Sequence, residues 1–262
     1  MSKEIYAPVG GKAQKITKLY APVNGVARNI KKAYRGVNGI ARQVFEAGPP
    51  IYNAFYENTW ESVIYACQTR RVPASWYVGD QLTMTIDGKI FLVGIIGKNH
   101  DTYADGSGKA PLTFRLYTAY NPSYPMNSTA TNVGGWHSST MRTATLPAIL
   151  AKMPSAVQAA IKPVKKLTSA GDRGSNIITS VDKLFLLSAV ELLGEVGYSA
   201  PGEGTQYAYY AAGYKKNQIG LDSWTRSPVL SANNAFQTLT ASDGYSMRSA
   251  DWLCPISFAF CF

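Results

Sequence analysis

The feature that most limits the possible folds is an internal repeat in the first 46 positions. Its three units are IYAPVGGKAQKITK from Ile5, LYAPVNGVARNIKK from Leu19 and AYRGVNGIARQVFE from Ala33. A repeat of fixed period indicates small structural units that bury their apolar faces by stacking. We therefore expect residues 1–47 to form a repeat arm. The alternative is an N-terminal extension of the main domain's own sheet.

Each unit of the repeat has the pattern of a β-hairpin. Asn24-Gly25 and Asn38-Gly39 supply the positive φ angles of a tight two-residue turn, and Gly10-Gly11 adopts such angles equally well. The flanking residues alternate between apolar and polar, as in half-buried strands. Because one hairpin of this length is only marginally stable in water, the units must stack on each other, on other subunits or on a partner. Stacking on a partner would make the arm a docking module.

The charge of the chain is concentrated in this arm. The net charge is +10, of which the first 46 residues contribute nine basic and two acidic side chains, or +7, and the rest +3. A basic segment suits nucleic acid or an acidic protein surface. Because these charges are spread through a regular apolar pattern and form no Lys/Arg block, we expect no nucleic-acid partner.

Composition excludes several classes of protein for the chain as a whole. Hydrophobic residues make up 46% of the sequence, which is too many for a disordered chain. No apolar run approaches the roughly 18 residues that span a bilayer, so membrane insertion is not expected. The N-terminus lacks the apolar region of a secretory signal. The three cysteines, an odd number, predict buried free thiols.

Gly48-Pro49-Pro50 marks a boundary, after which we expect a linker or stalk over residues 48–75, either a short helix or a first strand pair. Residues 76–262 have an α+β pattern of short strands, one or two helices and long polar loops. Within this region we expect strands at 81–86, 90–96, 112–117 and 183–187 and helix within 138–161. We expect loops at 98–111, 121–135 and 168–180. Ser188 and Glu191 have the spacing of a capping box, and Cys254–Phe262 alternates as a terminal strand.

Motifs for catalysis are scarce in this sequence. It contains two histidines and none of the short motifs for zinc, for a phosphate loop or for a nucleophile elbow. We therefore expect no catalytic residues, no metal and no cofactor. Paired carboxylates need no sequence proximity, so an enzyme acting on cell-wall or capsule glycans stays open as an alternative.

The C-terminal third interleaves Tyr and Trp with Ser, Asn and Asp. This composition resembles that of antibody paratopes, where rigid aromatic area is combined with adaptable hydrogen bonding, and it also suits sugars. Tyr245, beside Gly244 in a turn, is the best surface candidate. The alternative for Trp224, Phe236 and Trp252 is a place in the hydrophobic core.

Several segments resemble a known family. They are IFLVGIIGKNHDTYADGSG at 90–108, WHSSTMR at 136–142, KLFLLSAVE at 183–191, TQYAYY at 205–210, SWTRSP at 223–228 and the terminal CPISFAFCF. Over about residues 76–262 the chain resembles a domain of unknown function from phage and bacterial genomes. That domain is similar to the C-type-lectin-like fold, which includes the formylglycine-generating-enzyme type and the variable receptor-binding proteins of diversity-generating retroelements. The GVNGVAR-like repeats resemble segments that precede it in phage tail proteins.

This resemblance implies a phage tail-tip, fibre or baseplate protein in the virion, whose lectin-like head meets a bacterial surface glycan or protein. In the retroelement relatives the ligand face is formed by the last hairpins, which here are residues 233–252. The calcium-binding triplets of sugar-binding C-type lectins are absent, so calcium-mediated binding is not expected. The cysteine pair of the formylglycine-generating enzymes has no counterpart either, which argues against that activity.

The most favoured function is therefore receptor binding by the head, with the arm docked to other tail proteins and the chain assembled as a homo-oligomer, for which we expect a trimer. The alternative is a structural virion protein, a baseplate, adaptor or decoration component without direct host contact. The candidate ligand-binding residues are Trp224, Arg226, Asn233, Asn234, Tyr245, Met247, Ser249, Asp251 and Trp252.

Overall fold

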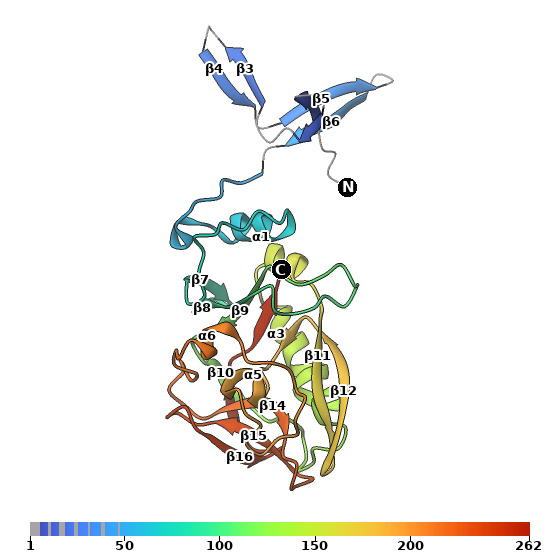
Figure 1. The fold of residues 1–262 in the computed structure, drawn as a ribbon, viewed down its shortest axis with the longest axis vertical. Coiled ribbons are helices and arrows are strands. Elements are labelled where there is room, and N and C mark those ends of the chain that lie inside the picture. The colour runs from blue at the N-terminus through green and yellow to red at the C-terminus, as the bar shows by residue number, and fades with distance from the viewer. Residues whose placement is uncertain are drawn as a thin grey trace. The chain divides into compact units, whose positions relative to one another are not determined.

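The computed structural model describes residues 48–262 and, within residues 1–47, the backbone of six strands. The chain divides into two compact units, Met1–Pro50 and Ile51–Phe262. Figure 1 shows the elements of both units, coloured along the chain. Mostly antiparallel strands with a few short helices make this a mixed α and β protein, compatible with the α+β class.

The repeats of the first unit form three antiparallel strand pairs. The strands are β1 (Tyr6–Val9), β2 (Lys12–Lys15), β3 (Leu19–Val23), β4 (Val26–Ile30), β5 (Lys32–Val37) and β6 (Ile40–Glu46). β1 pairs with β2, β3 with β4 and β5 with β6, and Val23 opposes Val26 at the end of the second pair. The three turn dipeptides lie outside the described residues. The pairing follows the alternation that each repeat shows in sequence.

The largest sheet of the second unit has five antiparallel strands in the order β13-β18-β9-β8-β7. Its strands are β7 (Gln81–Ile86), β8 (Lys89–Lys98), β9 (Leu112–Leu116), β13 (Leu184–Phe185) and β18 (Ala259–Cys261). The strands predicted at 81–86, 90–96 and 112–117 are thus confirmed. Because the C-terminal strand β18 lies between β13 and β9, it joins segments that are far apart in the sequence.

The helices of the second unit are short. They are the 3-10 turn η1 (Phe55–Glu57), α1 (Trp60–Gln68), α2 (Gly135–Ser138), the π-helical turn η2 (Met141–Thr145), α3 (Leu146–Leu150), α4 (Ser155–Ala160), α5 (Ala189–Leu193) and α6 (Ala208–Ala211). The capping box of α5 is confirmed, since the Ser188 hydroxyl accepts from the Glu191 backbone N–H and the Glu191 carboxylate accepts from that of Ser188. In the described part of the chain, no helix combines the length and apolar character that crossing a membrane requires.

Residues 51–75, expected as a linker or stalk, fold into the second unit. Thr59 caps α1 by accepting a hydrogen bond from the backbone N–H of Ser62. The Trp60 ring lies 5.4 Å from that of Phe114 on β9, and Phe55 lies 5.1 Å from Trp76. Burial of these aromatic rings holds the segment against the sheet. Phe55 is therefore a core residue and Trp60 packs against the core, whereas Tyr52 and Tyr56 are exposed.

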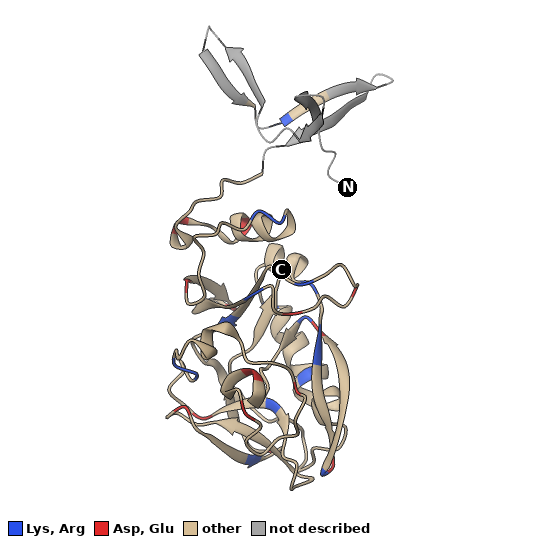
Figure 2. Cartoon of the chain, in the orientation of Figure 1, with Lys and Arg blue, Asp and Glu red and all other residues tan. Residues whose placement is uncertain are grey.

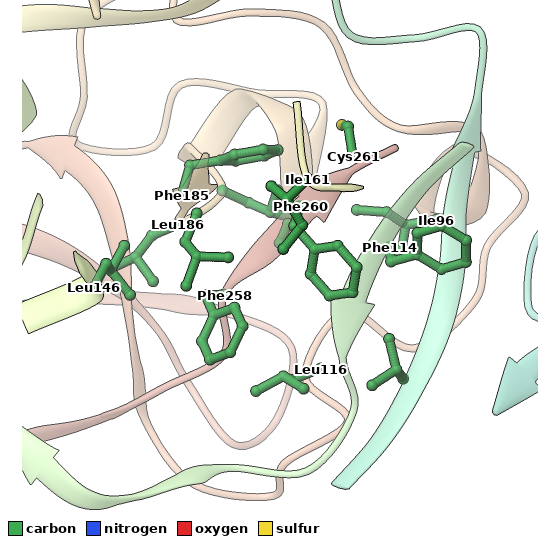
Figure 3. Packing of buried hydrophobic residues seen from close by; sticks show 14 of the residues in the cluster. Ile96, Phe114, Leu116, Leu146, Ile161, Phe185, Leu186, Phe258, Phe260 and Cys261 are labelled. Atoms are coloured by element: carbon green, nitrogen blue, oxygen red, sulfur yellow. The ribbon is translucent and has the colours of Figure 1, made fainter. Parts of the chain in front are cut away.

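The core is rich in aromatic residues from β9 and the C-terminal segment. Phe114 stacks on Phe260 at 5.5 Å, with Phe258, Leu116 and Phe185 in the same cluster (Figure 3). The predicted terminal strand is interrupted: β17 (Cys254–Ile256) and β18 are separate strands, and all residues from Ile256 to Phe262 are buried. All three cysteines are buried free thiols, as expected.

Two segments interpreted as loops contain strands. Residues 168–180 belong to a long hairpin of β11 (Val164–Gly171) and β12 (Gly174–Asp182), and β10 (Tyr120–Tyr124) pairs with β17. The Gly and Ser content favoured a loop at 168–180. The structure instead buries small polar residues such as Thr168 and Ser169 beside hydrogen-bond partners, which makes a polar strand stable in the interior.

Candidate binding surface

The residues expected to bind a ligand lie on or beside a second sheet of three strands. The strands are β14 (Ser223–Pro228), β15 (Ala235–Leu239) and β16 (Tyr245–Ser249), in that order (orange to red in Figure 1). Every residue of β14 and β15 is buried, whereas β16 at the sheet edge is partly or fully exposed. The sheet is therefore a buried support with one accessible strand.

Aromatic and apolar side chains gather at this edge. Tyr245 and Met247 point to the same side of β16 by the two-residue period of a strand, and they are 39% and 38% exposed. The ring of Tyr198, from the loop after α5, meets the Tyr245 ring edge-on at 5.1 Å and is 40% exposed. We call Tyr198, Tyr245 and Met247 the β16 surface.

The other expected contact residues lie just before β15, at the end of β16 or just after β16. The side chains of Asn233, Asn234 and Asp251 are exposed, and Ser249 is half-buried, donating its hydroxyl hydrogen to Asp251 Oδ1 at 2.5 Å. Trp252 follows β16 and is 59% exposed. Asn233, Asn234, Asp251 and Trp252 are thus open to solvent, and Ser249 is partly so.

Trp224 and Arg226 are buried and do not reach the surface, so their assignment as ligand contacts is corrected. Trp224 is 2% exposed and its indole N–H donates to the Tyr124 carbonyl at 2.8 Å. Arg226 is fully buried and forms a bidentate ion pair with Glu191. Both belong to β14, which is covered along its whole length, so both residues are structural.

Two asparagines that the sequence analysis did not single out hold the turns beside β15. The Asn132 amide donates to the carbonyls of Ala232 at 2.9 Å and Ala235 at 2.8 Å. The Asn217 amide donates to the carbonyls of Leu221 and Thr240, both at 2.8 Å. Because both asparagines are buried, these bonds are protected from water and give the exposed loops a fixed base.

A buried charge cluster, defined as Asp101, Lys166, Glu191, Glu203 and Arg226, lies beneath this sheet. The Lys166 ammonium is 2.7 Å from Asp101 Oδ1 and 2.6 Å from Glu191 Oε1. Arg226 pairs with Glu191 and donates to the Leu167, Leu186 and Glu203 carbonyls. Hydrogen bonds of this kind are needed to offset the desolvation of buried charges. The cluster joins the loop after β8 to β11, α5 and β14.

The carboxyls of this cluster differ in their ionisation. Burial would raise the pKa of Asp101, but attraction to Lys166 and hydrogen bonds from Lys166 and Thr113 outweigh it and bring the pKa to about 2. Burial also opposes the ionised form of Glu191, yet the charges of Arg226 and Lys166 lower its pKa. For Glu203 burial dominates and raises the pKa above the ordinary value of 4.5. Glu203 therefore retains its proton to higher pH than the other two carboxyls.

We predict that Glu203→Gln removes one part of the pH dependence of stability. The folded state binds the Glu203 proton more tightly than the unfolded chain, so this carboxyl stabilises the fold below about pH 4.5 and that contribution is lost as the pH rises through the folded-state pKa. Urea unfolding at a series of pH values measures this, with the exposed Glu195→Gln as control. The decrease in the free energy of unfolding above about pH 4.5 should be weaker in Glu203→Gln than in the wild type and in Glu195→Gln. Equal profiles for Glu203→Gln and the wild type would contradict the assignment.

Two exposed residues near this sheet were missed from the sequence, Tyr198 and Leu253. Tyr198 lies in the Gly- and Pro-containing segment GYSAPGEG, and Leu253 directly follows Trp252. An aromatic residue within a Gly- and Pro-rich loop was the available signal for Tyr198. Its contact with Tyr245 could not be predicted from local spacing, because Tyr245 lies 47 positions later in the chain. The exposure of Leu253 could not be predicted, because an apolar residue directly before a buried strand is usually a core residue.

Across the second unit, Lys and Arg are interspersed with Asp and Glu (Figure 2). In the described residues, no group of three or more His, Cys, Asp or Glu side chains is arranged to hold a metal ion. The β16 surface presents the rings of Tyr198 and Tyr245 and the side chain of Met247 to solvent.

Comparison with known proteins gives one match. A family model described as a domain of unknown function (DUF6273) matches residues 112–255, from β9 to β17, which is more than half of the chain. No curated protein and no solved structure matches the chain. The matched region contains β16, together with Lys166, Glu191, Glu203 and Arg226, while Asp101 lies before it. The chain therefore belongs to the DUF6273 domain family.

Proposed function

We propose that the second unit is a lectin-like binding head and that the chain attaches a phage tail to a bacterial surface ligand. The observation that carries the proposal is the β16 surface, where aromatic and apolar side chains stay exposed on an otherwise buried sheet. Exposed side chains on a rigid support bind with little loss of conformational entropy. This arrangement favours recognition over a purely structural role.

The ligand class that fits this surface is a glycan or a protein of the bacterial surface. The faces of Tyr245 and Trp252 suit stacking against a sugar ring or an apolar side chain, and their exposure leaves them accessible. Asn233, Asn234, Ser249 and Asp251 supply short hydrogen-bonding groups that fix orientation. Buried Trp224 and Arg226 have no part in this contact.

The C-type-lectin-like fold is part of the same proposal. It is supported by the short antiparallel strands, the few helices and the long connections, among them those between α5 and α6 and between α6 and β14. Such connections on a fixed scaffold commonly carry binding residues. The three strand pairs of the first unit support the docking of residues 1–47 to other tail proteins, and assembly into a trimer would raise a weak affinity through multivalency.

The alternative, a structural virion protein without host contact, rests on the same strand pairs, because stacked hairpins suit assembly as well as attachment. The two functions differ in what the full-length protein does in isolation. We would incubate the labelled protein with a panel of bacterial cells and measure the bound amount against its concentration. Saturable binding to some strains supports attachment. Absence of binding from every strain, by a protein that still assembles, supports the structural function.

A further inference from the structure

Within the buried charge cluster, Lys166, Asp101 and Glu191 are in direct contact. The side chains of Lys166 and Asp101 are each 2% exposed and that of Glu191 is 3% exposed. The ammonium lies over the Phe185 ring, 4.2 Å from its centroid, so the carboxylates share this space with an aromatic wall. An amine and two carboxyls are thus held in contact away from bulk water.

We propose that Lys166 and Asp101 condense to an intramolecular amide bond, with Glu191 carrying one of the two transferred protons. Lys166 Nζ is hydrogen-bonded to Asp101 Oδ1 at 2.7 Å, one bond from the carbonyl carbon that it attacks. Fixed contact of this kind replaces a bimolecular encounter and accounts for large rate gains in intramolecular reactions. The positions are 65 residues apart, so the bond would close a long loop of the chain.

Every proton in this reaction is already present in the cluster. The Lys166 ammonium gives one proton to Glu191 Oε1, 2.6 Å away, and the neutral amine attacks Cγ of Asp101. The nitrogen loses a second proton as the amide forms, and the C–Oδ1 bond breaks. Oδ1 leaves as water with these two protons, one of them returned by Glu191. An ammonium and a carboxylate become an amide and a water molecule, with no change in net charge.

The second oxygen of Asp101 is held for this reaction. Thr113 donates its hydroxyl hydrogen to Oδ2 at 2.6 Å, and the Tyr207 hydroxyl is within hydrogen-bond distance of both carboxyl oxygens, 2.9 Å from Oδ2 and 3.0 Å from Oδ1. Donors placed in this way stabilise the negative charge that develops on the carboxyl oxygens in a tetrahedral intermediate. The Cys261 thiol is a further, longer contact of Oδ2 at 3.6 Å. Oδ1, which faces the lysine, is the oxygen that leaves.

The buried charges that remain after the Lys166–Asp101 amide has formed also favour the amide over the ion pair. Burying an ion pair costs desolvation free energy that its mutual attraction often fails to repay. The amide removes both the Lys166 and the Asp101 charge from the interior. Glu191 then keeps Arg226 as its bidentate partner, and the pair is neutral in sum. Because Arg226 lowers the pKa of Glu191, this carboxyl releases the transferred proton to the leaving oxygen.

The test is the intact mass of the folded full-length protein, measured after denaturation. The expected mass is that of the sequence less one water, and a tryptic digest should contain a branched peptide that joins the segments of Asp101 and Lys166. Lys166→Met and Glu191→Gln, each checked for folding by circular dichroism, should have their full sequence mass. Lys162→Met is the matched control, because Lys162 contacts Asp105 at the similar distance of 2.8 Å but is open to solvent. It should still lose one water.

If the wild-type protein has its full sequence mass, no amide bond has formed and the proposal is overturned, whatever the variants show. A water loss that persists in Lys166→Met, or that maps to an Asp-Gly pair such as Asp105-Gly106, would overturn it as well, because it would report a succinimide. Cross-linking of Glu191→Gln at the wild-type rate would remove Glu191 from the mechanism.

Discussion

Replacing Arg226 by methionine is expected to lower the free energy of unfolding by about 3–5 kcal/mol, the cost of breaking a buried ion pair from one side. The substitution leaves the Glu191 carboxylate without its bidentate partner in a fully buried position. It also removes the donor to the Leu167, Leu186 and Glu203 carbonyls. Equilibrium unfolding in guanidinium chloride, with the wild type in parallel, measures the loss.

Arg248→Met is the matched control for this experiment. Arg248 pairs with Asp222 at 3.1 Å, but the two side chains are 40% and 34% exposed, so solvent screens their attraction. Such pairs contribute at most about 1 kcal/mol. A small loss in Arg248→Met with a large one in Arg226→Met is the expected pattern. Similar small losses in both would mean that Arg226 is not an essential buried partner.

Replacing Trp224 by alanine is expected to destabilise the second unit by about 3–5 kcal/mol, the usual cost of removing a large buried aromatic side chain. Trp224 is 2% exposed and packs edge-on against Phe236, with ring centroids 6.5 Å apart. Its indole hydrogen bond to Tyr124 connects β14 to β10. The variant should therefore show a lower thermal midpoint and a lower free energy of unfolding.

Trp252→Ala provides the comparison, because Trp252 is 59% exposed. Exposed substitutions away from special features change stability by about 0.5 kcal/mol or less. Trp252→Ala should therefore unfold like the wild type in the same denaturant series. A loss as large as that of Trp224→Ala would show that Trp252 is a core residue and would remove it from the proposed contact surface.

These two tryptophans show where sequence reasoning reaches its limit. Both lie among Ser, Arg and Asp residues in the same third of the chain, and local pattern gave them the same interpretation. Their burial depends on tertiary pairing: Trp224 is on a covered strand, whereas Trp252 follows the edge strand β16. The partner of Arg226 is likewise 35 residues away, and no spacing rule connects the two positions.

Elements whose signal is local were predictable. The strand pair β7–β8, with Asp87-Gly88 between the two strands, follows from alternation and turn chemistry, and the α5 capping box follows from two residues three apart. The β11–β12 hairpin was missed because its buried Thr and Ser residues are satisfied by Glu203, a partner distant in sequence. The break after Ile256 was missed because the apolar alternation runs through it.

Binding of a bacterial ligand by the β16 surface and by Trp252, which follows β16, is measured by dissociation constants on a strain that the wild-type protein binds. We would compare Tyr245→Ala and Trp252→Ala with Tyr77→Ala, whose side chain is 65% exposed. Loss of an aromatic contact at the centre of an interface weakens binding roughly tenfold or more. We expect that loss for the first two variants and none for Tyr77→Ala. Unchanged binding in both, with the fold intact, would contradict it.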